Sequence, residues 1–191
     1  STFVYHLINY FLSINEKNSY SIKNFSINND NFTYLNIINN IHPNFFFIGL
    51  RDLDFEIKIE QIKKLKNFIN KSTYSKDLKI IMIDNAELLN VNSSNALLKI
   101  LEEPHNNTFF FIIHSSNFKI SNTIKSRCHI FNIFFNKKSK EQILKKILEQ
   151  YNYDLNAGEL LDLFPYETPG NLVNYFLSSL HPDTNINKNI K

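Results

Sequence analysis

The stretch that decides the fold reads KIIMIDNAE over residues 79–87. Four consecutive apolar residues, Ile80 to Ile83, are followed at once by the carboxylate of Asp84. A short continuous apolar run is typical of a strand that is buried on both faces of a sheet. Open α/β sheets bind ligands beyond the carboxyl ends of such strands. Asp84 is therefore expected at the edge of the sheet where a ligand would bind.

Similar apolar runs lie on both sides of this stretch and alternate with helical patterns. Further strands are predicted over residues 45–48, 109–113 and 129–134, and helices over residues 59–69 and 94–101. The helical segments carry apolar residues at spacings of three and four. Strands that alternate with amphipathic helices predict an α/β fold, a mostly parallel sheet with flanking helices, over residues 1–135.

Toward the amino end, residues 1–12 predict an amphipathic helix with Phe3, Leu7, Tyr10, Phe11 and Ile14 on its apolar side. A polar loop over 15–31 and a short helix over 34–41 are expected to follow. Beyond residue 136 the strand pattern stops, and helices are predicted over 139–151, 156–164 and 169–180. These three helices predict a small helical domain over 136–180, and residues 181–191 have the composition of a linker or disordered tail.

Composition narrows the class of protein. With 191 residues, 43% hydrophobic and 20% charged, the chain is that of an ordinary globular protein. A net charge of +3 permits contact with nucleic acid but does not require it. Cys128 is the only cysteine, so neither a disulfide nor a cysteine zinc site can form within this chain, which fits a reducing cytoplasm. The six histidines show no metal-ligand spacing, and we expect no metal held by these side chains.

Two motifs carry a resemblance to a known family: SSNALLKILEEP over residues 93–104 and SRC over residues 126–128. They resemble the delta-prime subunits of bacterial DNA polymerase III clamp loaders, which belong to the AAA+ class. The resemblance runs from Ser1 to about Leu180. It implies an AAA+ P-loop NTPase-like core followed by a three-helix lid, in a chain that lacks the family's N-terminal strand with the P-loop and its C-terminal collar. It also implies partners: the delta and tau/gamma subunits, the sliding clamp, and primer-template DNA.

The resemblance gives Arg127 a role in catalysis on a neighbouring subunit. In clamp loaders the arginine of SRC points into the adjacent ATP site, where a planar, permanently charged guanidinium stabilises the charge that develops during phosphoryl transfer. Almost all the positively charged residues of the chain are lysines, and only Arg51 and Arg127 are arginines. Without the motif, Arg127 would be interpreted as one half of a surface ion pair.

The resemblance also predicts a degenerate nucleotide site within the chain itself. Asp84 matches the Mg²⁺-holding Walker B aspartate, but the next residue is Asn85, whose amide cannot accept a proton. No arginine follows Arg127, although TPGN at residues 168–171 resembles the start of the helix that carries one. Ser1 and Thr2 match the end of a P-loop and Ser116 a sensor 1 residue. ATP with Mg²⁺ is expected instead at the interface with the neighbouring subunit.

Simpler interpretations stay open for several of these residues. Asp84 and Ser116 could cap turns, and Lys99 with Glu102 and Glu103 could form a solvated helix face. The basic stretch at Lys137, Lys138, Lys140, Lys145 and Lys146 is expected to be a solvated face as well. Two other functions share the motifs: an active tau/gamma-type ATPase, and a degenerate AAA+ interaction domain of another assembly.

Overall fold

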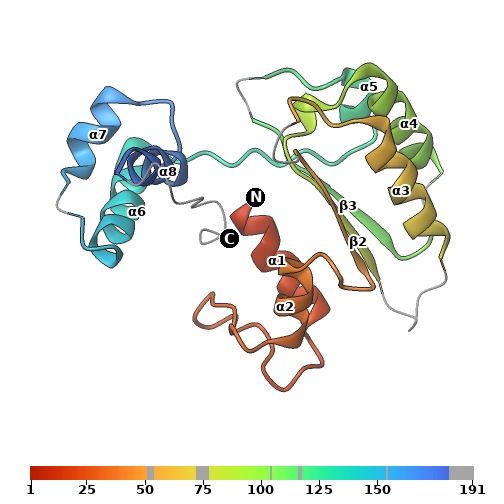
Figure 1. The fold of residues 1–191 in the computed structure, drawn as a ribbon, viewed down its shortest axis with the longest axis horizontal. Coiled ribbons are helices and arrows are strands. Elements are labelled where there is room, and N and C mark those ends of the chain that lie inside the picture. Colours follow the sequence, from red (N-terminus) through yellow and green to blue (C-terminus); the bar gives the residue numbers. More distant parts are fainter. Residues whose placement is uncertain (51–53, 72–77, 104, 116–117, 154, 181–191) are drawn as a thin grey trace. The chain divides into compact units, whose positions relative to one another are not determined.

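The computed structural model describes the chain except for residues 51–53, 72–77, 104, 116–117, 154 and 181–191 (Figure 1). It divides into two compact units, Ser1–Ile130 and Phe131–Lys191. The sequence placed a boundary a few residues later, between 135 and 136. No helix among the described residues is long and apolar enough to cross a membrane.

The first unit is built on a parallel sheet of three strands in the order β1-β2-β3. These are β1 (Phe45–Ile48), β2 (Lys79–Ile83) and β3 (Thr108–Ile112), so three of the predicted strands and the α/β class are confirmed. Phe45 lies opposite Ile80, and Ile80 lies opposite Phe109. Because β2 has a strand on each side and helices on both faces, Ile80 to Ile83 are fully buried.

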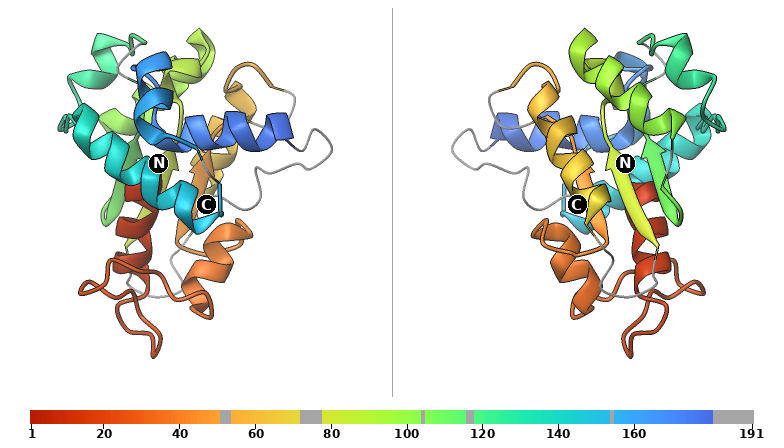
Figure 2. Two further views of the ribbon diagram at one scale, coloured as in Figure 1. Left: turned by 90° about the vertical axis from the view of Figure 1, so that its left-hand side faces the viewer. Right: turned by 90° about the vertical axis from the view of Figure 1, so that its right-hand side faces the viewer.

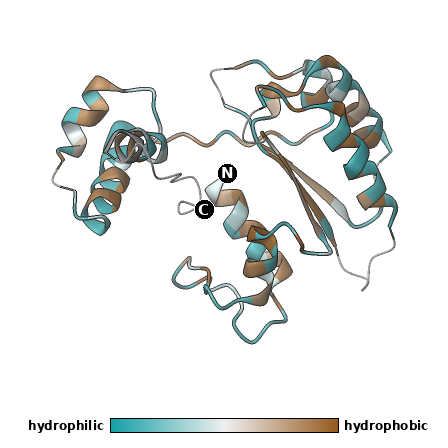
Figure 3. Cartoon of the chain, viewed as in Figure 1, coloured by the Kyte–Doolittle hydropathy of each residue, from teal (hydrophilic) through white to brown (hydrophobic). Residues whose placement is uncertain are grey.

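Two helices cover one face of the sheet. α3 (Ile59–Asn70) joins β1 to β2, and α4 (Val91–Glu102) joins β2 to β3 (Figure 1). Their apolar stripes pack on Ile81 and Ile83, which point to this face because side chains alternate along a strand. The colouring in Figure 3 follows this arrangement, with brown strands and a largely teal outer surface on α3. Both helices were predicted, and α4 begins three residues earlier than expected because Asn90 caps it, accepting from the backbone N–H of Ser93.

The opposite face of the sheet is covered by α1 (Thr2–Leu12) and α2 (Phe32–Ile38) (Figure 2). Here Ile8 and Ile37 pack against Ile80 and Met82. The predicted apolar side of α1 is wrong: Phe3, Phe11 and Ile14 are exposed, whereas Val4, Tyr5, Ile8 and Leu12 face the sheet. The helix is apolar on most of its circumference, so its sequence pattern is compatible with more than one buried face. Packing on the sheet buries the face with Val4, Tyr5, Ile8 and Leu12.

The polar segment between α1 and α2 is held by a buried side chain. Asn31 is only 1% exposed, and its Oδ1 caps α2 by accepting from the backbone N–H of Tyr34 at 2.6 Å. Its Nδ2 donates to Glu16 Oε2 and to the carbonyl of Asn18, both at 2.8 Å. One amide therefore fixes the start of α2 and the loop that leads into it.

The predicted strand over residues 129–134 is wrong. Residues 129–136 form neither helix nor strand, and apolar side chains in this segment are exposed, Phe131 to 86%. Strand propensity describes a fit to a neighbouring strand and a buried face, so apolar and β-branched composition alone does not make a strand. In the described part of the chain this segment pairs with no strand. The edge of β3 that faces away from β2 is likewise not paired with any described strand.

The second unit consists of three helices that follow the predicted ranges closely: α6 (Lys137–Gln150), α7 (Ala157–Leu163) and α8 (Pro169–Leu180). Leu144 and Leu148 of α6, Leu161 of α7 and Leu172 of α8 meet in one apolar core. Polar residues fix the helix starts. Asn136 accepts from the N–H of Ser139, Asn156 accepts from those of Gly158 and Glu159, and Thr168 accepts from that of Asn171.

Candidate functional site at Arg127 and the carboxyl edge of the sheet

Asp84 lies where the sequence placed it, directly after the central strand β2. Its backbone N–H donates to the carbonyl of Ile48 at 2.9 Å, which extends the pairing of β1 with β2 by one residue. Its carboxylate accepts from the backbone N–H of Asn85 at 3.2 Å. Asn85 is exposed and adopts a left-handed conformation (φ 53°), which asparagine tolerates better than most residues. The turn into the 3-10 helix Ala86–Leu88 therefore sets the direction of both side chains.

The charge of Asp84 reaches α1 on one face of the sheet. Burial, with a smaller contribution from Asp84, raises the pKa of the Tyr5 phenol to about 12. The Tyr5 ring is tilted against the rings of Phe45 and Phe47, with its centroid 6.4 Å from each of theirs. Ser1 and Thr2 begin α1, and the Ser1 side chain makes no capping hydrogen bond. Within the described residues no hydrogen bond links Ser1 or Thr2 to Asp84. The grouping of these residues with Ser116 in one nucleotide site stays a prediction.

The loop after β3 makes a contact that the sequence did not predict. The backbone N–H of Ser115 donates to Glu87 Oε1 at 3.3 Å. Glu87 Oε2 is buried and has no hydrogen-bond partner among the described residues. The predicted sensor 1-like residue, Ser116, lies outside the described residues. Among the residues that are described, no three histidine, cysteine, aspartate or glutamate side chains gather as a metal site would need.

Arg127 is held at the surface by two strong hydrogen bonds. It lies two residues beyond the end of the one-turn helix α5 (Asn122–Lys125), which the sequence did not predict. Its Nη1 donates to the carbonyl of Thr123 at 2.8 Å, and its Nη2 donates to Glu102 Oε1 at 2.7 Å. The Arg127 side chain remains 34% exposed. The guanidinium is thus not buried in the core, and it takes part in the surface ion pair that the simpler interpretation expected.

The partner of Arg127 comes from the other motif. Glu102 ends α4, and it was expected to belong to a solvated helix face. Because 25 residues separate the two side chains, no helical or strand spacing could have linked them. α4 and α5 pack against each other, and Leu97 and Ile124 share the core beneath the pair. The two motifs therefore form one structural unit at the surface.

The remaining motif residues have structural roles. Cys128 is half buried against the core, and burial raises the pKa of its thiol, which favours the unreactive protonated form. Pro104, which was expected to end α4, lies outside the described residues. In the basic stretch of α6, Lys137 pairs with Asp162, Lys140 donates to the carbonyls of Pro165 and Glu167, and Lys145 lies 4.0 Å from Glu149. Three of the five lysines are thus engaged within their own unit.

Comparisons with known proteins agree with the motifs. A family model described as "DNA polymerase III, delta subunit" matches residues 18–137. The chain is 34% identical over 87 residues to DNA polymerase III subunit delta' of Pseudomonas aeruginosa, covering 46% of this chain and 26% of that protein. It is 32% identical over 139 residues to DNA polymerase III subunit gamma of Buchnera aphidicola subsp. Schizaphis graminum, covering 70% of this chain and 38% of that one.

One solved structure extends the comparison to three dimensions. A DNA polymerase III gamma subunit-related protein from Thermotoga maritima matches with a TM-score of 0.48 and 23% identity, over 63% of this chain and 45% of that one. The chain spans about a quarter to two fifths of the two curated relatives named above. Because the family model covers more than half of the sequence and includes both motifs, the chain belongs to the DNA polymerase III, delta subunit family.

Proposed function

We propose that this chain works as a clamp-loader subunit of the delta-prime type, which helps to place a sliding clamp on primed DNA in the cytoplasm. The two compact units would be the AAA+ core and its helical lid. Arg127 would act in trans on ATP bound by a neighbouring tau/gamma subunit, with the delta subunit elsewhere in the same assembly. The exposed but anchored guanidinium of Arg127 is the observation that carries this proposal.

The anchoring suits a residue that must meet a phosphate on another chain. A long arginine side chain loses entropy when it is fixed, and Glu102 and Thr123 fix it before the partner arrives. Arginine has five N–H donors, so donors remain for a phosphate oxygen after both of these contacts are made. An exposed ion pair of this kind contributes only about 0–1 kcal/mol to folding, so its loss should leave the fold intact.

The same proposal holds that this subunit hydrolyses no ATP itself. Asn85 stands where active relatives place the glutamate that activates water, and its amide is a poor base. Asp84 could still hold the Mg²⁺ of a bound nucleotide, with Ser1, Thr2 and Ser116 as the other candidate contacts.

The test uses the full-length protein reconstituted with the delta and tau/gamma subunits, the sliding clamp and primed DNA. Arg127→Ala should leave assembly unchanged while slowing clamp loading and lowering DNA-dependent ATP turnover, since an arginine finger accelerates its site by ~10³-fold or more. Arg127→Lys keeps the charge but loses the fork, so it should fall between Arg127→Ala and wild type. Unchanged ATP turnover with Arg127→Ala would refute the role in trans.

Glu102→Gln tests whether the ion pair positions the arginine. We expect a smaller loss than for Arg127→Ala, and the double variant should lose no more than Arg127→Ala alone, because Glu102 would act only through the arginine. Lys58→Ala breaks an exposed ion pair with Asp54 in the same unit and is the matched control, for which we expect no change. Additive losses from the two substitutions would contradict a positioning role.

A second candidate function is supported by the gamma relative, which matches more of this chain than the delta' relative does. On that proposal the chain belongs to an active ATPase, and the isolated full-length protein would turn over ATP. Turnover that disappears in Asp84→Ala would favour this alternative over the delta-prime function proposed above.

A further inference from the structure

The outer surface of the first unit carries a groove between α3 and α4 that the proposed function does not use. The groove has a volume of about 470 Å³. Its floor is apolar, and is formed by Ile62, Ile69, Ala96 and Ile100. The volume falls within the range of about 300–1,000 Å³ that is usual for ligand sites.

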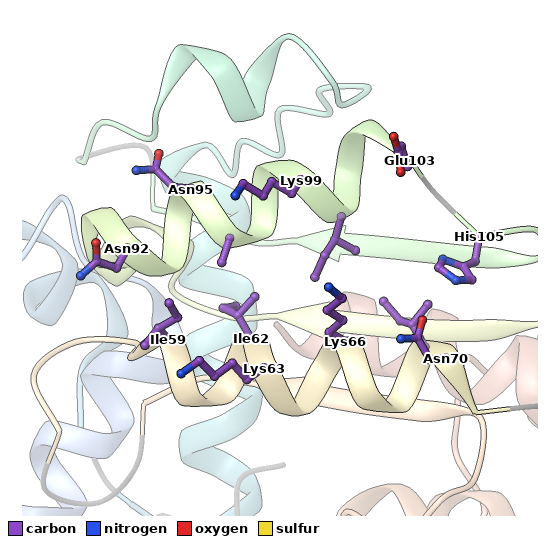
Figure 4. A pocket seen from close by; sticks show the side chains of 13 residues that line it. Ile59, Ile62, Lys63, Lys66, Asn70, Asn92, Asn95, Lys99, Glu103 and His105 are labelled. Carbon is purple, nitrogen blue, oxygen red and sulfur yellow. The ribbon is translucent and has the colours of Figure 1, made fainter.

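The two walls present side chains in matching rows. α3 contributes Ile59, Lys63, Lys66 and Asn70. Figure 4 shows Ile59 and Lys66 pointing toward the space between the helices, whereas Lys63 lies along α3. α4 contributes Asn92, Asn95, Lys99 and, just past its end, Glu103 from the other side (Figure 4). Each row spans 11 residue steps, so the groove extends about 16 Å, or three helical turns. That length and spacing match a short helix that anchors itself at positions i, i+3 or i+4, and i+7.

The rim of the groove carries more positive than negative charge. Lys63, Lys66 and Lys99 are exposed, and Glu103 is the one carboxylate among the lining residues. Within the part of the chain that the structure describes, none of the three rim lysines forms an ion pair, so they are available to carboxylates from another molecule.

We propose that the groove between α3 and α4 binds a short amphipathic helix of a partner protein, with apolar side chains on the floor and acidic side chains against Lys63, Lys66 and Lys99. The apolar floor distinguishes this occupant from nucleic acid, because a phosphate backbone gains its affinity from charge and leaves such a floor uncovered. The proposal does not depend on the role of Arg127, which takes no part in lining the groove.

The test uses the full-length protein and a labelled synthetic helix of about 14 residues, with leucines at i, i+3, i+4 and i+7 and glutamates on both flanks. A peptide of the same design with lysine in place of glutamate is the matched control. Fluorescence anisotropy should show saturable binding of the acidic peptide, weakened by added salt. It should show no binding of the basic peptide.

Two variants locate the binding site. Lys63→Glu combined with Lys66→Glu should weaken binding of the acidic peptide about tenfold, because two attractions become repulsions. Lys64→Glu makes one such charge reversal on α3 outside the groove, and it should alter the affinity less than about twofold. Circular dichroism confirms that the variants remain folded.

Three results would overturn the proposal. The first is no saturable binding of the acidic peptide. The second is an equal loss of peptide affinity in the Lys64→Glu variant and the double variant. The third is a labelled DNA duplex that binds more tightly than the peptide and whose binding is lost in the double variant. The last result would assign the surface to nucleic acid instead.

Discussion

Lys79 offers the sharpest test of how the first unit is held together. This lysine begins the central strand β2 and is only 6% exposed. Its Nζ donates to the carbonyls of Phe68 at 3.2 Å, Ile69 at 2.7 Å, and Lys71. These carbonyls lie at the carboxyl end of α3, where a helix leaves acceptors unsatisfied and carries partial negative charge. A strand side chain thus closes the end of a helix that has no capping glycine.

The magnitude follows from what Lys79→Met removes. Methionine keeps a long apolar side chain but cannot donate, so three acceptors lose their partner. A hydrogen bond from a charged group contributes about 1.5–3 kcal/mol net, and a cation at a helix end adds about 0.3–1 kcal/mol. The variant also avoids the cost of burying an ammonium, which offsets part of this sum. We expect a net loss of about 2–4 kcal/mol, a large fraction of the ~5–15 kcal/mol that stabilises a typical domain.

The assay is equilibrium unfolding in urea, followed by circular dichroism at pH 7. Lys64→Met is the matched control, because Lys64 is exposed on α3 and because lysine and methionine have similar helix propensities. This variant should change the free energy of unfolding by no more than about 0.5 kcal/mol. A loss below about 1 kcal/mol for Lys79→Met would refute the idea that this side chain closes the helix.

The pH dependence of the Lys79 variant provides a second check. Burial lowers the pKa of Lys79 below its usual value of 10.5, so the folded state releases this proton before the unfolded state does. The wild type therefore gains stability relative to Lys79→Met as the pH rises through the folded pKa toward 10.5. A deficit of the variant that shrinks over this interval would contradict the assigned direction of the shift.

Two further predictions concern other buried polar groups of the first unit. Asn31→Asp keeps a good capping oxygen, but its second carboxylate oxygen faces Glu16. We therefore expect a loss of about 2–3 kcal/mol in the free energy of unfolding in urea at pH 7, and a smaller loss near pH 4. An unchanged free energy of unfolding would show that Glu16 moves away. Tyr5→Phe removes a phenol whose pKa is raised to about 12. Between pH 10 and 12 the phenol of the unfolded wild type ionises, so the wild type should lose stability over this interval and the variant should not. Identical pH profiles of the free energy of unfolding would contradict the burial of this phenol.

Local patterns of the sequence were sufficient for much of the fold. The apolar runs at 45–48 and 80–83 and the three-and-four spacing at 59–69 predicted β1, β2 and α3, because each pattern is set by the geometry of its own element. The motifs SSNALLKILEEP and SRC identified the family because each is a contiguous stretch of sequence. Such a stretch can be recognised without information on its tertiary contacts. Asp84 likewise lies at the strand end where the run of apolar residues placed it.

Tertiary structure decided everything that depends on a partner distant in the sequence. The apolar segment 129–134 has strand composition, yet it forms no strand in the described structure because strand pairing needs a neighbour with free hydrogen-bonding groups. The buried side of α1 was chosen by the sheet, and the contacts of Glu102 with Arg127 and of Lys79 with the end of α3 join residues with no local spacing in common. The sequence determined most of the elements and the family, whereas only packing determined which faces are buried and which charges meet, because those energies arise between elements and not within them.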